Sequence, residues 1–372
     1  MAFPPLVDPI TALTEAEAAR TARHAALYPF GGEGQRRLAA AHVAIVGAGG
    51  LGSPAVLALA AAGIGRITII DDDVVEASNL QRQVLHRMSD LGSAKTASAV
   101  RAARDLAPEC DVTEIRERVT PENAERLLSG ADVVLDGTDT LATREAVASA
   151  CERLGVPLVW GVVQEFQAQV TVFWSKPPAG VPPTRLGDLY PPGSAGELPT
   201  CAAVGVLGAL VMHVGSIMST QAILLIAGIG DPLVGRIALI DGLRSTTREV
   251  PLRARATGSA GDEPRAPHMM PEIDVGALTA RLRSDAAPLV VDVRSQAERA
   301  EAAIGGSAWI PIDDILADPA AAADRLRAEA AGRDVVTVCA AGARSARATA
   351  ALARAGVPSR SLSGGLSAWF SA

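Results

Sequence analysis

The residues of this sequence that most clearly suggest a chemistry lie early in the chain. An apolar run is followed by four glycines: Gly47, Gly49, Gly50 and Gly52. Three of them give the spacing G-x-G-x-x-G, in which the first makes a tight turn, the second lets the backbone approach a phosphate and the third lets a helix pack closely on a strand. Asp71 follows the next apolar run and is placed to accept hydrogen bonds from ribose hydroxyls. This pattern predicts a nucleotide site, but an NAD-dependent dehydrogenase would share it.

The polar residues after Asp71 favour ATP over a redox dinucleotide. Asn79, Arg82 and Gln83 lie within a dozen residues after Asp71, and Lys95 follows twelve residues after Gln83. We therefore expect two cations and two amides to converge beside the phosphates. A dehydrogenase needs no such clamp. Only two of the 34 basic residues are lysines, and an ammonium is not interchangeable with a guanidinium, so the lysine at 95 suggests a geometric role. The alternative is a solvated lysine on the first turn of a helix.

A second pair of acids follows another apolar run. Asp136 and Asp139 belong to the sequence DGTDT, directly after a run typical of a buried strand. Ligands of open α/β sheets bind at the carboxyl ends of the strands, and hard cations take carboxylate oxygens. We therefore expect Asp139 to reach a Mg²⁺ ion that bridges phosphate oxygens. The alternative is a plain helix N-cap, and one side chain can serve both purposes.

Two cysteines stand where a thiol could act as a nucleophile. Cys339 begins a loop of small residues that leads through Gly342 to Arg344 and Ser345 at the start of a helix, so that backbone N–H groups, a helix dipole and a guanidinium surround the sulfur. Such a loop stabilises a thiolate or a persulfide. Cys201 ends a proline- and glycine-rich loop at 176–200 and precedes an apolar helix. A buried structural cysteine is the alternative at position 201.

The elements that must position these residues form two α/β patterns. Apolar strands alternate with helices up to about residue 255, a linker composition spans 256–271, and a second α/β pattern covers 272–372. The first pattern predicts a Rossmann-like domain with a mostly parallel sheet, and the second a small α/β domain. The stretch 201–230 carries no formal charge. It is long enough to span a membrane, but its polar residues and its α/β context favour a helix buried in a core or a subunit interface.

Composition limits the classes of function. The net charge of −7 argues against a general nucleic-acid binder, so an anionic ligand must be held by local cations. The four cysteines form no C-x-x-C pair, and no basic-then-apolar signal segment begins the chain. We expect reduced thiols and a cytoplasmic location. Arg20 and Arg23 cluster on a short helical stretch near the N-terminus. From the sequence alone, a solvated basic helix face explains this cluster as well as a functional role does.

The motifs GAGGLG, DxDxVxxSNLQRQ, GxxK and DGTD together resemble the MoeB/ThiF type of ubiquitin-activating-like adenylyltransferases over residues 15–255. Residues 272–372 resemble a rhodanese domain, and the order of the two is similar to the MoeZ type. The resemblance implies contacts to ATP and Mg²⁺ from seven positions: Gly50, Asp71, Asn79, Arg82, Gln83, Lys95 and Asp139. It also implies that Arg23 reaches the nucleotide site of the partner subunit in a homodimer, and that Cys201 matches the crossover-loop cysteine.

The implied reaction is the ATP-dependent adenylation of a small ubiquitin-like sulfur carrier that ends in Gly-Gly. A persulfide on Cys339 would then supply sulfur for a thiocarboxylate, with a cysteine desulfurase or thiosulfate as the sulfur donor. Three departures stand out: Thr21 replaces the usual aromatic residue, no paired cysteines are present for a structural zinc, and the stretch 302–306 lacks the usual Gly-His. The rivals are an NAD(H) oxidoreductase, adenylation with an unrelated rhodanese activity, and an inert scaffold.

Overall fold

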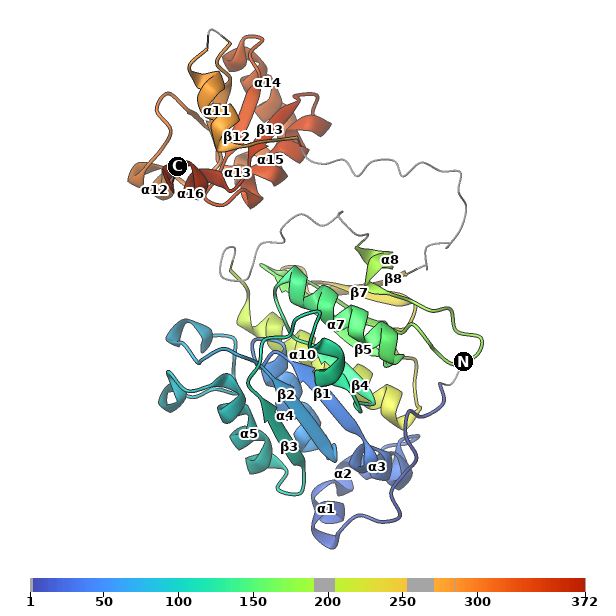
Figure 1. Cartoon of the computed structure of the whole chain (residues 1–372). Coiled ribbons are helices and arrows are strands. Elements are labelled where there is room, and N and C mark those ends of the chain that lie inside the picture. The colour runs from blue at the N-terminus through green and yellow to red at the C-terminus, as the bar shows by residue number, and fades with distance from the viewer. Residues whose placement is uncertain (1–2, 191–204, 253–270, 285, 372) are drawn as a thin grey trace. The chain divides into compact units, whose positions relative to one another are not determined.

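The computed structural model describes residues 3–190, 205–252, 271–284 and 286–371 (Figure 1). Contacts divide the chain into two compact units, 1–257 and 258–372. The predicted boundaries at 255 and 271 stay predictions, because 253–270 lie outside the described residues. Each unit is described by itself.

The first unit is built around one eight-stranded sheet with the order β3-β2-β1-β4-β5-β6-β7-β8. Its strands are β1 (His42–Val46), β2 (Arg66–Ile70), β3 (Asp111–Ile115), β4 (Val133–Asp136), β5 (Leu158–Gln164), β6 (Gln167–Phe173), β7 (Arg236–Asp241) and β8 (Thr246–Pro251). Neighbouring strands from β3 to β5 are parallel, and those from β5 to β8 are antiparallel. The predicted Rossmann-like fold class is confirmed, and the strand order reverses between β1 and β4, where such sheets bind ligands.

Helices cover both faces of this sheet (Figure 1). The described helices of this unit are α1 (Glu15–Arg20), α2 (Ala22–Ala25), α3 (Gly31–Ala40), α4 (Gly52–Ala62), α5 (Lys95–Leu106), α6 (Ala124–Leu128), α7 (Leu141–Leu154), α8 (Leu186–Leu189) and α10 (Gly208–Ala227), with 3₁₀ turns η1 (Ala77–Asn79) and η2 (Met88–Asp90). In β1, Val43 and Ile45 join the core under α4, α5 and α10, while Ala44 and Val46 join the core under α6 and α7. Burial on both faces explains why β1 is a continuous apolar run.

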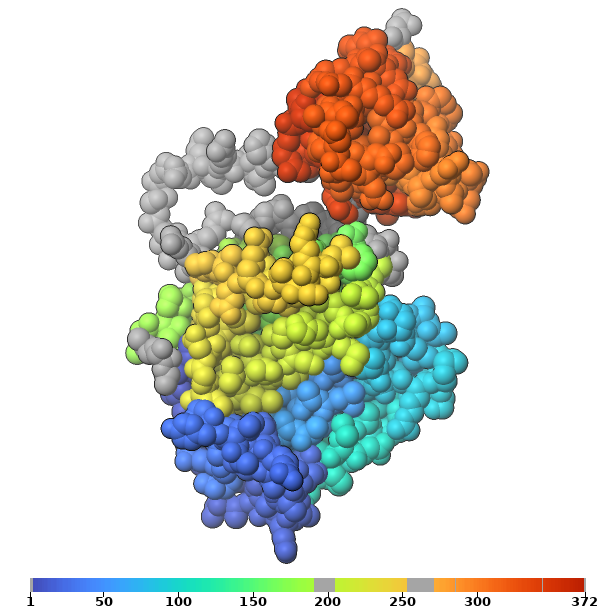
Figure 2. Space-filling model, turned by 180° about the vertical axis from the view of Figure 1, so that it is seen from behind, coloured from blue at the N-terminus to red at the C-terminus, as the bar shows by residue number. Residues whose placement is uncertain are grey.

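The apolar helix α10 belongs to the core of the first unit. It is long and apolar enough to cross a membrane by length and composition alone, but 56% of its most apolar window is buried inside the fold. Gly215 and Gly208 let it approach α4 and the Gln81 carbonyl closely. In the view from behind, the yellow-green band that includes α10 also forms part of the surface (Figure 2). The described part of the predicted loop, 176–190, contains the short helix α8, and its Thr184 forms an isolated β-bridge with Trp174.

The second unit has a five-stranded sheet with the order β11-β10-β12-β13-β9, in which all neighbours are parallel. Its elements are β9 (Glu272–Ile273), α11 (Val275–Leu282), β10 (Leu289–Asp292), α12 (Gln296–Glu301), β11 (Ala308–Trp309), α13 (Ile312–Ala317), α14 (Pro319–Ala330), β12 (Val335–Val338), α15 (Ala343–Arg354), β13 (Ser359–Leu362) and α16 (Gly365–Ser371). Strand β12 lies centrally and is fully buried. The loop from β12 to α15 therefore begins at the carboxyl end of a central strand.

Candidate functional site

The glycine turn lies between β1 and α4, and its geometry requires glycine at two positions. Gly47 has a φ of +89°, which L side chains rarely adopt. A Cβ on Gly52 would lie 1.8 Å from the Gly47 carbonyl oxygen, so no side chain fits there. At Gly49 the nearest atom to a built Cβ is 3.5 Å away, so this position has room. The first and third glycines thus shape the turn, and the second leaves its backbone accessible.

A cavity of about 370 Å³ opens beside this turn, at the carboxyl ends of β1, β2 and β4. This volume is typical of a small-molecule site. Of the residues singled out in the sequence, nine line the cavity: Gly47, Gly49, Gly50, Asp71, Asn79, Arg82, Gln83, Lys95 and Asp139. Tertiary structure therefore brings together side chains that follow three different strands.

Asp71 connects the cavity to the glycine turn. Its carboxylate accepts hydrogen bonds from the backbone N–H groups of Ala48 at 2.7 Å and of Asp73 at 2.8 Å. Burial raises the pKa of this carboxyl, and the two N–H donors and Lys95 oppose that shift. Both oxygens keep further lone pairs, so the group can still accept from ribose hydroxyls.

The ammonium of Lys95 lies against Asp73. Its Nζ atom is 2.9 Å from an Asp73 carboxylate oxygen, and the backbone N–H of Lys95 donates to the Asp73 carbonyl at 3.0 Å. Lys95 is 7% exposed, whereas the Asp73 side chain is 58% exposed. An ammonium has three donors, so this contact leaves two for another ligand. Lys95 is thus held at the cavity wall by Asp73, a carboxylate that is itself exposed to water.

Arg82, Gln83 and Asn79 line the same wall. Arg82 is half-buried and donates from Nη1 to the Ser78 carbonyl at 3.0 Å. Gln83 is buried, and its side-chain oxygen has no hydrogen-bond partner among the described residues. Buried polar atoms normally have one. The unpaired acceptor at the cavity wall therefore favours a ligand or water there. Asn79 is buried and caps η1.

The DGTDT segment contributes an exposed acid and a buried one. Asp139 is exposed at the cavity rim. Asp136 is fully buried, and burial raises its pKa; one of its oxygens accepts from the backbone and hydroxyl of Thr138, and the other has no partner among the described residues. Asp139 is thus the accessible carboxylate of this segment, and carboxylate oxygen suits a hard cation such as Mg²⁺.

Two residues that sequence reasoning missed support this site. His86 is buried between the Ala48 carbonyl, 3.0 Å from Nε2, and the Ser98 hydroxyl, and burial lowers its pKa. Arg144 lines the cavity, donates twice to the Thr138 carbonyl and lies over the Trp160 ring. A single histidine in a mixed polar and apolar stretch gives no local signal. Arg144 stands in the first turn of the helix after DGTDT, and this position was the available clue.

Of the other described residues predicted for the first unit, Gly52 and Arg23 do not line this cavity. Arg23 is exposed in α2, and the neighbouring Arg20 pairs with Glu17 and donates to the Ala61 carbonyl at the end of α4. Helix α4 begins at the glycine turn, beside the carboxyl ends of the strands. Its last turn therefore lies towards the amino ends of the strands, away from the cavity. Cys201 lies outside the described residues. A role for Arg23 at a nucleotide therefore requires a second copy of the chain.

In the second unit, Cys339 lies buried at the end of β12. The Gly342 N–H donates to its sulfur at 3.1 Å, and the Ser345 hydroxyl is 3.4 Å away. Gly342 can point its N–H inward because its φ is +98°. The Arg344 guanidinium binds both carboxylate oxygens of Glu298, at 2.8 and 2.5 Å. Arg344 thus belongs to the same loop as the sulfur and is already paired with an acid.

Comparisons with known proteins agree with this geometry. Residues 21–260 match the ThiF family, and residues 275–372 match the rhodanese-like domain. The chain is 37% identical to the probable adenylyltransferase/sulfurtransferase MoeZ of Mycobacterium tuberculosis, over 99% of this chain and 96% of that protein. It is 40% identical to the SAMP-activating enzyme E1 of Haloferax volcanii, over 63% of this chain and 85% of that protein.

Solved structures support the fold of the first unit. MccB of E. coli matches with a TM-score of 0.56 at 20% identity, over 65% of this chain and 71% of that one. The names of the relatives confirm the predicted class of enzyme, an adenylyltransferase joined to a sulfurtransferase, and the resemblance stated from the motifs is confirmed. The chain belongs to the ThiF family and carries a rhodanese-like domain after its ThiF domain.

Proposed function

We propose that this protein adenylates the C-terminal glycine of a small ubiquitin-like sulfur carrier and converts the product to a thiocarboxylate with sulfur held on Cys339. The observation that carries the first half is the cavity beside the glycine turn. Arg82, Lys95 and Arg144 line it together with Asp71 and Asp139. Arg118 lines the cavity as well, and four cationic side chains at one cavity suit a triphosphate. An NAD-dependent dehydrogenase has no use for them. The names of the relatives support the same choice.

In the first step, a carboxylate oxygen of the carrier attacks the α-phosphorus of ATP and pyrophosphate leaves. Lys95 and Arg82 would offset the charge that develops in this in-line displacement, while Asp71 holds the ribose. Asp139 would hold Mg²⁺, which neutralises charge on the phosphate oxygens when it is bound. The acyl-adenylate is a reactive acyl donor, because AMP is a far better leaving group than the oxide ion that a free carboxylate would have to expel.

In the second step, the terminal sulfur of a Cys339 persulfide attacks the acyl carbon and AMP leaves, which gives an acyl disulfide. Attack of a second thiol on the Cys339 sulfur then releases the carrier thiocarboxylate and leaves a disulfide for a cellular thiol to reduce. We propose Cys201 as this thiol; an initial thioester on Cys201 is the alternative order. The Gly342 N–H and the start of α15 would stabilise the anionic sulfur.

A homodimer, in which Arg23 reaches the nucleotide of the other copy, is part of this proposal because Arg23 is distant from the cavity of its own chain. The sulfur donor, a cysteine desulfurase or thiosulfate, and the cytoplasmic location are likewise predictions. The identity of the carrier is open, and a neighbouring gene for a small protein that ends in Gly-Gly would name it.

The test separates the two chemistries with one variant. Carrier-dependent exchange of pyrophosphate into ATP should survive Cys339→Ala, because the thiol acts after the acyl-adenylate forms. Thiocarboxylate formation, measured by the mass of the carrier, should be lost. If the Cys339→Ala variant still makes thiocarboxylate at full rate, the second unit serves an unrelated sulfur transfer. Nicotinamide binding without any exchange would instead favour the oxidoreductase.

A further inference from the structure

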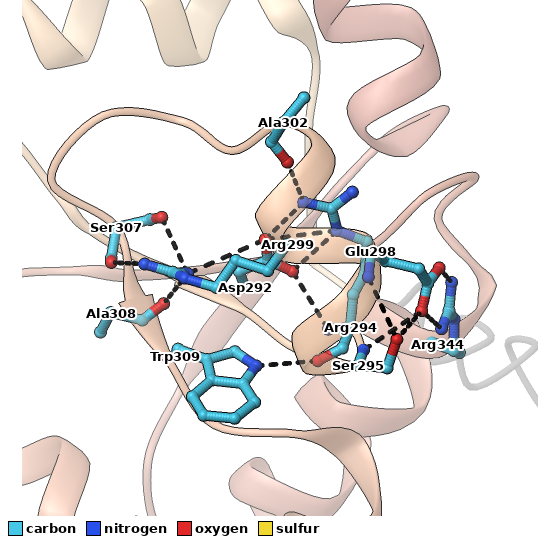
Figure 3. A network of polar contacts seen from close by, with 10 residues as sticks. All are labelled: Asp292, Arg294, Ser295, Glu298, Arg299, Ala302, Ser307, Ala308, Trp309 and Arg344. Atoms are coloured by element: carbon cyan, nitrogen blue, oxygen red, sulfur yellow. Dashed lines mark hydrogen bonds and ion pairs between the residues drawn. The ribbon is translucent and has the colours of Figure 1, made fainter.

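Two groups of paired charges lie next to each other along the chain, and the second includes Arg344 of the Cys339 loop (Figure 3). Asp292 is fully buried and is bound by Arg294 through two nitrogens, and Arg299 approaches it at 3.8 Å. Glu298 caps the start of α12 through Ser295 and also binds Arg344. Figure 3 shows Glu298 between Ser295 and Arg344. The first group thus lies at the end of strand β10, and the second pairs helix α12 with the loop through Glu298 and Arg344.

Arg344 is the only charged residue in the loop sequence CAAGARS. Its guanidinium meets the Glu298 carboxylate with two parallel hydrogen bonds, the geometry that neutralises both groups most completely. The Glu298 hydrogen bonds raise the pKa of Arg344, and the same pairing lowers the pKa of Glu298 to about 2. The other side chains of the loop, apart from the buried Ser345, are three alanines and the thiol. The loop therefore offers little unpaired positive charge to a small anion.

This pairing has a consequence for loading Cys339 with sulfur. With thiosulfate, the thiolate attacks the outer sulfur, the sulfur–sulfur bond of thiosulfate breaks, and its electron pair leaves with sulfite. The enzyme keeps a persulfide anion. Both the reactant and the leaving group are dianions, so a nearby uncompensated cation would accelerate this step. A donor that presents only a persulfide sulfur has no sulfonate for such a cation to bind.

We propose that Glu298 is a specificity-determining residue of sulfur loading: by occupying Arg344, it disfavours small anionic sulfur donors such as thiosulfate. This inference rests on the proposed role of Cys339 as the persulfide-bearing residue. It concerns the donor and not the carrier, so its assays need neither ATP nor a carrier. A failure of carrier adenylation would leave them unaffected, and the two failures can be told apart.

The central variant is Glu298→Gln in the full chain. Glutamine at this position can keep the cap on Ser295 and can still accept from Arg344, but the pair gains one positive charge. The matched control is Glu301→Gln, which makes the same charge change at an exposed position of the same helix. The readout is thiosulfate-to-cyanide sulfur transfer, in which cyanide leaves as thiocyanate and restores the thiolate.

We expect Glu298→Gln to raise kcat/KM for thiosulfate about tenfold, which corresponds to one unit charge acting on a dianion through partly solvated surroundings. The gain should shrink as salt is added. Glu301→Gln should change kcat/KM less than about twofold, as expected for an exposed charge. An unchanged rate in Glu298→Gln, or an equal gain in Glu301→Gln, would overturn the proposal.

A second measurement works even if the variant folds poorly. Iodoacetate and iodoacetamide alkylate the same thiolate and differ mainly in charge, so the ratio of their rates at Cys339 reports the local potential. Peptide mass spectrometry resolves Cys339 from the other cysteines. In the unchanged protein the ratio should not exceed that of free cysteine, and it should rise in Glu298→Gln. A ratio well above that of free cysteine in the unchanged protein would show an unneutralised cation and refute the proposal.

Discussion

Replacement of Lys95 by methionine separates the stability of the first unit from its chemistry. Methionine keeps an unbranched apolar stem of similar length and a good helix propensity at the start of α5, so the change removes mainly the ammonium. The partner of that ammonium, Asp73, is more than half exposed. Without Lys95, water can therefore solvate the Asp73 carboxylate, and the Asp71 carboxylate keeps its two backbone N–H donors.

These contacts set the expected magnitudes. An ion pair with an exposed partner contributes about 1 kcal/mol or less to the free energy of unfolding, so the melting temperature should move by only a few degrees. A pre-positioned charged donor that faces a transition-state oxyanion contributes about 3 kcal/mol, which is roughly a hundredfold in rate. Lys95→Met should therefore lose about a hundredfold in pyrophosphate exchange while it stays folded. Lys95→Arg should recover only part of this loss, because a guanidinium does not fit an ammonium position.

The assay is carrier-dependent exchange of labelled pyrophosphate into ATP, with thermal unfolding followed in parallel. Lys176→Met is the matched control, because Lys176 is the other lysine of the chain and lies exposed against the Arg153 carbonyl. Its exchange rate should equal that of the unchanged protein. If Lys95→Met keeps more than about half of the activity, the assignment of Lys95 to the phosphates fails.

Gly52→Ala should abolish ATP binding measured by calorimetry and lower the melting temperature, because its Cβ would meet the Gly47 carbonyl oxygen at 1.8 Å, whereas Gly187→Ala, which has open space, should do neither. Asp139→Asn should raise the Mg²⁺ concentration for half-maximal exchange about tenfold without a change in melting temperature, since the side chain is exposed; an unchanged Mg²⁺ dependence would remove Asp139 from the metal site. The pKa of Glu298 is lowered to about 2 in the folded protein, against about 4.3 when unfolded. Its stabilisation is therefore fully present above about pH 4.3 and is lost as the pH falls towards 2. The difference in melting temperature between the unchanged protein and Glu298→Gln should vanish over that range, and a difference that persists at pH 2 would contradict the pairing with Arg344.

The sequence determined those features that depend on neighbouring residues. Gly47 and Gly52 were predictable because positive φ and close backbone approach are local demands that only glycine meets. The strands before Asp71 and Asp136 were predictable because a strand buried on both faces must be an unbroken apolar run. Because these strands are parallel, their carboxyl ends lie together at one end of the sheet, and the acids and cations gather there.

Tertiary structure alone decided which charges pair. Lys95 meets Asp73 across 22 positions of sequence, Arg344 meets Glu298 across 46, and His86 binds the Ala48 carbonyl across 38. No local pattern specifies such partners, because a charged side chain can reach any acid that the fold brings within a few ångströms, and burial then determines how strong the pairing is. The sequence therefore predicted a nucleotide-binding turn and a thiol loop. Only the tertiary structure determined that Lys95 pairs with the solvated Asp73 and that Arg344 of the Cys339 loop is neutralised by Glu298.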